Sequence, residues 1–111
     1  MEEFDVIIVG AGPAGMTAGI YASRRALKTL IIGQVIGGQM MSTTWIENYP
    51  GFKQIKAVEL VKRFEDHVRS FGVDILQDLV TEIKEVEGGF IVKTNTNEYK
   101  AKAVILAFGK S

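Results

Sequence analysis

The sequence lacks cysteine altogether and has only one histidine and two prolines among its 111 residues. Without cysteine, the chain cannot form disulfide bonds, thiolate metal sites or cysteine-based redox centres. With His67 as its only histidine, no zinc site is expected. No apolar run approaches the roughly 20 residues that span a bilayer. The acidic start, MEEFDVIIVG, lacks the basic n-region and long apolar core of a signal peptide. We therefore expect a cytoplasmic chain without a membrane partner.

An excess of charge of one sign is also missing. The 13 basic and 13 acidic side chains balance to a net charge of zero. No cluster of lysine and arginine is dense enough to follow a nucleic-acid backbone, so a nucleic-acid partner is not expected. Hydrophobic residues make up 47% of the chain, which is enough for one modest domain with its own core.

The N-terminal part predicts a strand, a helix and a second strand. Phe4–Val9 (FDVIIV) and Lys28–Ile32 (KTLII) are nearly continuous apolar runs, typical of strands buried on both faces of a parallel sheet. Between them, Pro13 to Arg25 has good helix content, with its proline where a first turn tolerates one. Together they make a β-α-β unit of about 30 residues.

The rest of the chain predicts a loop, a second helix and further strands. Gly33 to Tyr49 is expected to be a loop, and apolar residues at helical spacing predict an amphipathic helix over Lys56 to Phe71. Two of the remaining strands would form an antiparallel hairpin around Gly88-Gly89, with a third beside them. In chain order the strands are expected at Val73–Leu76, Leu79–Val86, Phe90–Thr94, Glu98–Lys102 and Ala103–Phe108.

Gly10, Gly12 and Gly15 form the pattern G-x-G-x-x-G between the first strand and the first helix. In that pattern the glycines provide a tight turn, close approach of backbone to a pyrophosphate, and close helix–strand packing. The helix N-terminus adds unpaired N–H groups and a partial positive charge, which favour an anion. The surrounding strand–helix–strand context predicts a dinucleotide site. The alternative is a strand–helix turn that binds no ligand.

The polar residues beyond the second strand are less easily assigned. An acid usually ends this strand and binds the adenosine ribose, but Gly33 and Gln34 stand there. Either the Gln34 amide or the backbone alone would serve. Gln39 and Asn48 are the other polar candidates, and the alternative for them is to fix their loop through side-chain-to-backbone hydrogen bonds. No catalytic residue is assigned.

Three motifs together resemble the FAD-binding half of the thioredoxin reductase family. They are G-A-G-P-A-G (Gly10–Gly15), G-G-Q (Gly37–Gln39) and I-E-N-Y-P-G-F (Ile46–Phe52). The final A-V-I-L-A-F-G, which resembles the family's ILATG, extends the similarity along the whole chain. The resemblance implies an α/β fold: a Rossmann-like, three-layer FAD-binding domain with a parallel sheet and a small antiparallel hairpin or meander.

The resemblance also implies a set of flavin contacts. The glycine loop would hold the pyrophosphate, and Gly33 and Gln34 would lie by the adenosine. Gly38, Gln39 and Asn48 would follow the ribityl chain and flavin ring, while the backbone of Val80 would meet the adenine. The last strand would pass close to the cofactor, although Phe108 replaces the family's usual threonine. The glycine-loop residues are Gly10, Ala11, Gly12, Pro13, Ala14 and Gly15, and those of the last strand are Ala107, Phe108 and Gly109.

The family continues beyond this point into an NADPH-binding domain with a C-x-x-C pair, and then returns to complete the FAD domain. Residues 1–111 are therefore expected to be a single FAD-domain segment, without the NADPH domain and the C-terminal FAD segment, and inactive alone. The parent would pass electrons from NADPH through the flavin to a thioredoxin-like protein disulfide.

Two alternatives to this function remain. The first is the corresponding part of a ferredoxin- or flavodoxin-NADP reductase, which works without the cysteine pair. The second is a non-catalytic, nucleotide-binding or self-associating fragment. Its apolar surface, such as Ala103 to Phe108, would be covered in a homo-oligomer.

Overall fold

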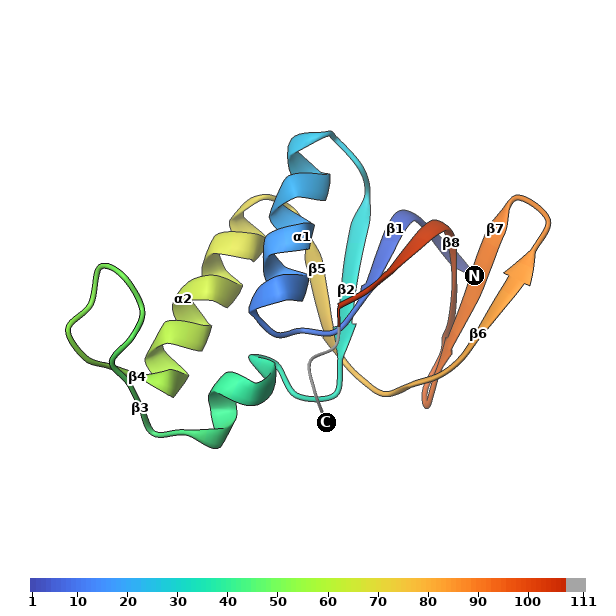
Figure 1. Cartoon of the computed structure of the whole chain (residues 1–111). Helices are drawn as coiled ribbons and strands as arrows, with labels where there is room; N and C mark the ends of the chain where they lie inside the picture. The colour runs from blue at the N-terminus through green and yellow to red at the C-terminus, as the bar shows by residue number, and fades with distance from the viewer. Residues whose placement is uncertain (108–111) are drawn as a thin grey trace.

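The computed structural model describes residues 1–107 and contains two α-helices, a short 3-10 helix and eight strands (Figure 1). In chain order the elements are β1 (Glu2–Val9), α1 (Pro13–Arg24), β2 (Thr29–Gly33), η1 (Gly38–Ser42), β3 (Trp45–Ile46), β4 (Ile55–Lys56), α2 (Ala57–Ser70), β5 (Asp74–Gln77), β6 (Val80–Val86), β7 (Gly89–Thr94) and β8 (Glu98–Leu106).

The main sheet has six strands in the order β5-β2-β1-β8-β7-β6. The pairs β5–β2, β2–β1 and β1–β8 are parallel, whereas β8–β7 and β7–β6 are antiparallel. The expected α/β class, with a parallel sheet and a small antiparallel meander, is confirmed. A parallel sheet brings the carboxyl ends of β1, β2, β5 and β8 to one edge, where ligands of such folds bind.

The predicted division of the last strands is wrong. Glu98–Lys102 and Ala103–Phe108 were expected as separate strands, but residues 98–106 form the single strand β8. Its first residues pair with β7 as far as Ala101, and it pairs with β1 from Tyr99 to Leu106. No glycine or proline interrupts the chain at Lys102, so nothing ends the strand there.

The segment expected to be a loop, Gly33 to Tyr49, also contains short regular structure. It includes the 3-10 helix η1 and the strand β3. Strand β3 is only two residues long and is defined by its pairing with the distant β4. A strand this short carries no periodicity of its own, which is why the sequence pattern did not predict it.

Two hydrophobic layers cover the parallel strands, one on each face. In a strand, successive side chains point to opposite faces. In β1, Ile8 therefore packs with the helices α1 and α2, whereas Ile7 packs with β7 and β8. Ile31 and Ile32 divide in the same way in β2. All four are fully buried, and each burial stabilises the fold by about 1.5–3 kcal/mol. Figure 1 shows the helices on one side of β1, β2 and β5, and the sheet continuing through β8 to β7 and β6 away from the helices.

Helix α2 is amphipathic, as its sequence predicts. Leu60, Val61 and Val68 face the core. Its exposed face carries ion pairs one turn apart, including Arg63 with Glu59 at 3.3 Å, which add a few tenths of a kcal/mol each. Within residues 1–107, no helix is long and apolar enough to span a membrane.

Asp5 joins three strands at the amino edge of the sheet. Its Oδ2 accepts a hydrogen bond from the main-chain N–H of Lys28 at 2.7 Å, where β2 approaches. Its Oδ1 lies 3.4 Å from the Lys102 Nζ on β8. The hydrogen bond from Lys28, followed by that from Lys102, lowers the pKa of Asp5 below its usual value of 3.8.

Asp5→Asn should remove part of the pH dependence of stability. A lowered pKa in the folded state stabilises the fold above the unfolded pKa, and this contribution is lost as the pH falls through the folded pKa. We expect the stability advantage of the wild type over Asp5→Asn to be present at pH 6 and to shrink below about pH 4. Urea unfolding at a series of pH values measures it. Asp74→Asn, at an exposed position of β5, is the control, and an equal acid effect there would contradict the assignment.

Candidate functional site

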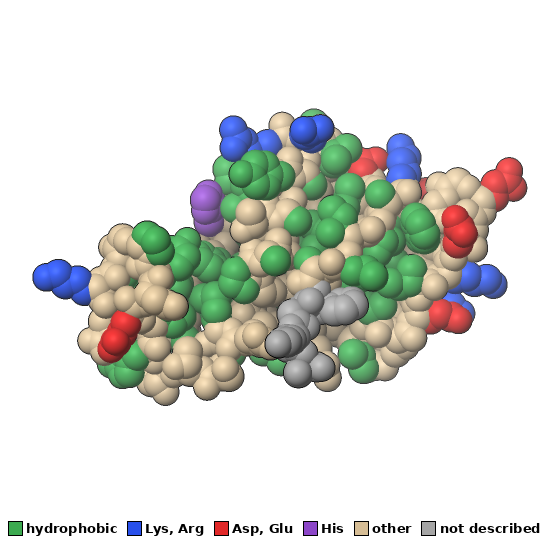
Figure 2. Space-filling view, viewed as in Figure 1, with side chains coloured by type: hydrophobic (Ala, Val, Ile, Leu, Met, Phe, Trp, Pro, Cys, Tyr) green, Lys and Arg blue, Asp and Glu red, His purple; other side chains and the backbone are tan. Residues whose placement is uncertain are grey.

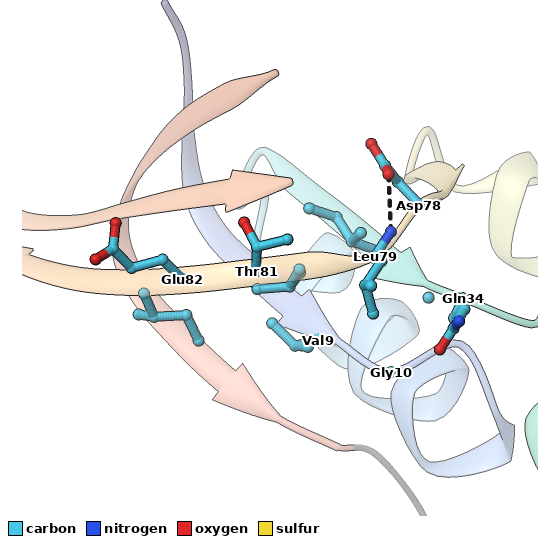
Figure 3. Close-up of a pocket in the computed structure, with 11 residues that line it drawn as sticks. Val9, Gly10, Gln34, Asp78, Leu79, Thr81 and Glu82 are labelled. Carbon is cyan, nitrogen blue, oxygen red and sulfur yellow. Dashed lines mark hydrogen bonds between the residues drawn. The ribbon is translucent and has the colours of Figure 1, made fainter. Parts of the chain in front are cut away.

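A cavity opens at the carboxyl edge of β1 and β2, beside the β5–β6 connection (Figure 3). Its volume is about 480 Å³, which lies in the range of small-molecule sites. The cavity lies at the sheet edge where the sequence predicts a nucleotide. Its lining residues are Val9, Gly10, Ile32, Gly33 and Gln34, together with residues 78–83.

Two of the three motif glycines are required by the fold itself. Gly10 has a φ of 126°, a conformation that side-chain-bearing residues rarely adopt, and its N–H donates to the Ile32 carbonyl at 2.8 Å. At Gly15, an added Cβ would lie only 1.8 Å from the Gly10 carbonyl oxygen. The missing side chain at Gly15 therefore lets α1 pack directly on the turn that follows β1.

Gly12 differs from both, because none of the described residues requires it to be glycine. Its φ is −85°, which any residue adopts. An added Cβ would meet no atom closer than 3.8 Å. Gly12 is the N-cap residue of α1, and no side chain caps this helix. The space that a side chain would fill therefore lies beside N–H groups that lack intrahelical partners.

The G-G-Q loop packs directly against the glycine loop. The Gly37 N–H donates to the Ala11 carbonyl at 2.8 Å. A Cβ at Gly38 would lie 3.1 Å from the Gly12 Cα. On the other side, a Cβ at Gly33 would lie 2.4 Å from the Ala11 Cβ. Three glycine-containing segments thus meet with almost no side chain between them, which leaves their backbones open to a ligand.

The structure brings most of the predicted contact residues to this edge. Ala107 joins them through its N–H, which donates to the Val9 carbonyl at 2.8 Å. Val80 lines the cavity together with Gly33 and Gln34. The group at this edge comprises Gly10, Ala11, Gly12, Pro13, Ala14, Gly15, Gly33, Gln34, Gly38, Val80 and Ala107.

Of the predicted residues within the described part of the chain, only Gly10, Gly33, Gln34 and Val80 line the cavity itself, and two others lie away from this edge. Gln39 lies in η1 and Asn48 lies in the loop between β3 and β4, and both are exposed. The ring of Tyr49 packs on Phe64 of α2, with the ring centroids 5.4 Å apart. This contact holds the Asn48 loop against α2 on the helical side of the site. Two further predicted contacts, Phe108 and Gly109, lie outside the described residues.

Sequence reasoning missed the wall of the cavity opposite the glycine loop. This wall is the segment 78–83, which follows β5 and enters β6, and only Val80 was predicted from it. Strand β5 lies parallel to β2, so its carboxyl end reaches the same edge of the sheet. The sequence predicts a strand at Val73–Leu76. If that strand is placed beside β2, the segment that follows it is expected to reach the cavity, and this is the signal that could have identified the wall.

The cavity holds no basic side chain among its described lining residues. Its two acids have partners elsewhere. Glu82 pairs with Lys93 at 3.4 Å, and hydrogen bonds from the side chains of Thr94 and Thr96 lower the pKa of Asp78. An anionic ligand would depend on backbone N–H groups and on the N-terminus of α1, whereas the apolar lining suits a planar ring.

Comparison with known proteins identifies the family of this chain. The sequence profile of the pyridine nucleotide-disulphide oxidoreductases matches residues 4–111. The chain belongs to this family. Thioredoxin reductase of Bacillus subtilis (strain 168) is 47% identical over 107 residues, which cover 96% of this chain and 34% of that protein. A 34.2 kDa protein in the rubredoxin operon of Clostridium pasteurianum is 42% identical, covering 97% and 36%.

Solved structures of this oxidoreductase family agree with the fold. Thioredoxin reductase of T. acidophilum superposes with a TM-score of 0.91 at 41% identity, covering 100% of this chain and 37% of that one. A ferredoxin-flavin thioredoxin reductase from Clostridium acetobutylicum gives 0.84 at 30% identity, covering 100% and 39%. The resemblance to thioredoxin reductases is confirmed, and the chain spans about a third of the length of these relatives.

Substituting the motif glycines one at a time separates those the fold needs from the one it does not. Gly15→Ala should lower the free energy of unfolding by about 3 kcal/mol, because its Cβ overlaps the Gly10 carbonyl. Gly12→Ala should lower it by no more than about 1 kcal/mol, the difference between glycine and alanine at an N-cap. Urea unfolding of both variants measures these effects. Equal losses would show that the fold itself requires glycine at position 12.

Proposed function

We propose that this chain binds FAD and is the FAD-domain segment of a thioredoxin reductase-like flavoprotein oxidoreductase. The observation that supports it most directly is the open space at Gly12, a position that is glycine although the protein around it leaves room for a side chain. A ligand that approaches the backbone closely accounts for this glycine. The pyrophosphate of a dinucleotide at the start of α1 has the size and charge to do so.

The proposed cofactor would extend in two directions from the pyrophosphate. The adenosine would enter the cavity beside Gly33, Gln34 and Val80, whose walls are largely apolar. The flavin would lie toward Gly38, Gln39 and Asn48, beside the loops that pack on α1 and α2. The end of β8, with Ala107, Phe108 and Gly109, would pass close to the cofactor. Bound flavin would supply the hydride and electron-transfer chemistry, while the protein holds and orients it.

The activity of the whole protein is part of the proposal. The chain has no cysteine, so a disulfide-reducing pair would belong to another part of the protein, with the NADPH-binding domain. Electrons would pass from NADPH through the flavin to the disulfide of a thioredoxin-like protein, in the cytoplasm. The second enzyme hypothesis is a ferredoxin- or flavodoxin-NADP reductase, which works without the cysteine pair.

Visible absorption spectroscopy of the purified, desalted chain, before and after addition of FAD, tests the cofactor proposal. We expect the wild type to retain flavin and Gly12→Asp to lose it, because an acid there fills the open space and repels the pyrophosphate. The control is Val58→Asp, which adds the same charge at an exposed position in the first turn of α2. It should bind FAD as the wild type does.

Circular dichroism should show that all three proteins are folded. Equal FAD affinity of the wild type and Gly12→Asp would contradict the glycine-loop assignment. A wild type that takes up no flavin would contradict the cofactor proposal for the chain as it stands.

A specific observation favours self-association as a second function. Strand β8 loses its β7 partner after Ala101, and beyond Lys102 the residues 103–106 carry no charge. Ile105 and Leu106 are 41% and 60% exposed. In the view of Figure 2, hydrophobic side chains gather near the centre of the molecule. An unpaired strand edge that carries apolar side chains is a template for pairing with another chain.

Sedimentation velocity of the flavin-free chain tests this second function. We expect the wild type to sediment as a dimer or larger species and Leu106→Lys to sediment as a monomer, since a charge on the open edge opposes strand pairing. Val58→Lys, which places a lysine on the exposed face of α2, should associate as the wild type does. A monomeric wild type would rule out self-association.

A further inference from the structure

Three loops meet at one wall of the proposed adenosine cavity, and Asp78 is bonded into all of them. The Asp78 N–H donates to the Gly33 carbonyl at the end of β2, at 3.0 Å. Its Oδ1 accepts the N–H of Leu79 at 2.8 Å within the β5–β6 connection. Its Oδ2 accepts the Thr96 hydroxyl at 2.6 Å from the turn between β7 and β8. Asp78 therefore links segments that are distant in the sequence.

The same contacts immobilise Leu79, which lines the cavity. The N–H of Leu79 is held by the Asp78 carboxylate, and its carbonyl accepts the Asn95 N–H at 3.1 Å. Both peptide groups of this partly exposed residue are thus fixed. Without these bonds, the β5–β6 connection would become ordered only when a ligand binds, and the entropy lost in that step would lower the affinity.

The turn on the far side of this contact is itself closely hydrogen-bonded. The Thr94 hydroxyl accepts the main-chain N–H groups of Thr96 and Asn97 at 3.2 and 3.1 Å. The Thr94 N–H donates to the Asn97 carbonyl at 2.8 Å. The Thr96 hydroxyl is therefore presented to Asp78 by a preformed turn rather than by a mobile loop.

The Asp78 carboxylate does not itself reach into the cavity. In Figure 3 it points away from Gly10 and Gln34, while the backbone of its segment forms the wall. Asp78 is therefore a positioning residue, which acts on a ligand through Leu79 and Val80. The acid that ordinarily ends the second strand and binds the ribose is absent here, since Gly33 and Gln34 stand in its place.

We propose that the bond between Asp78 and Thr96, which we call the Asp78–Thr96 latch, preorganises the adenosine-binding wall of the cavity. The latch sets affinity for ligands that contain an adenosine diphosphate group. This inference rests on the proposed function. It states that a residue outside the glycine motif controls binding at the adenosine end of the site. The Asp78 carboxylate acts from the β5–β6 connection. It fixes the backbone of the cavity wall and does not contact the ribose.

Titration of the wild type and three variants with FAD and with ADP tests the latch. Thr96→Val removes the hydroxyl that bonds Asp78 and should weaken both ligands by about tenfold, the effect of leaving one or two residues to be ordered on binding. Thr96→Ser keeps the hydroxyl and should bind within about twofold of the wild type. An equal loss for ADP, which has no flavin, places the effect at the adenosine end.

The third variant, Thr29→Val, separates positioning from general stability. Thr29 is buried at the opposite end of β2, and its hydroxyl donates to the Leu27 carbonyl at 2.8 Å. This variant should lose stability in urea and keep wild-type affinity. If it loses ligand affinity in proportion to its stability, the role of the latch is merely structural.

A double-variant cycle measures the coupling between Asp78 and Thr96 in ligand binding, which a general loss of stability does not produce. Asp78→Ala and Thr96→Val should each weaken ADP binding, and the double variant should be no weaker than the worse single variant, because both remove the same bond. Additive losses would contradict the latch.

The outcomes distinguish the two proposals. A wild type that binds ADP but not FAD would contradict the flavin function and still test the latch through ADP. Binding of neither ligand would overturn both proposals. Unchanged affinity in Thr96→Val would overturn the latch alone.

Discussion

The site depends on one close packing contact, between the Gly15 backbone and the Gly10 carbonyl. A Cβ at Gly15 would lie 1.8 Å from that oxygen, so α1 can begin immediately above the turn after β1 only because the side chain is missing. This contact directs the start of α1 toward the carboxyl edge of the sheet. It also brings Ala11 to the position where it meets Gly33 and accepts the Gly37 N–H. The later glycine loops are thus arranged around a geometry that the first one fixes.

The strand β8 carries a second constraint, since it belongs to two layers at once. It pairs with β1 along most of its length and with β7 only over its first residues. The meander is therefore continuous with the parallel sheet, yet its Val92 and Tyr99 pack back onto the face that α1 and α2 leave uncovered. This return places β6 across the carboxyl edge, where it forms the second wall of the cavity. The same strand both closes the core and shapes the site.

Local patterns predicted the elements whose causes are local. The apolar runs of β1 and β2, the periodicity of α2 and the glycine loop are present within a few residues of where the sequence indicates them. The division of β8 was wrong, because the change from mixed residues at 98–102 to apolar residues at 103–106 follows the loss of the β7 partner and not a break in the strand. Likewise β3 exists only through its pairing with β4. The 78–83 wall was missed because its role follows from the sheet order, in which β5 lies beside β2.

The two ends of the proposed nucleotide site differ in how they are built. At the pyrophosphate end, the determinants are a short motif, an uncapped helix start and absent side chains, all of which can be read from consecutive residues. At the adenosine end, Gly33 and Gln34 stand where an acid is usual, and the wall is backbone held by bonds between loops. Where ligand binding depends on the position of the backbone, the residues that determine it are those that hold this backbone in place. The residues that control this end therefore include ones, such as Thr96, that do not line the cavity at all.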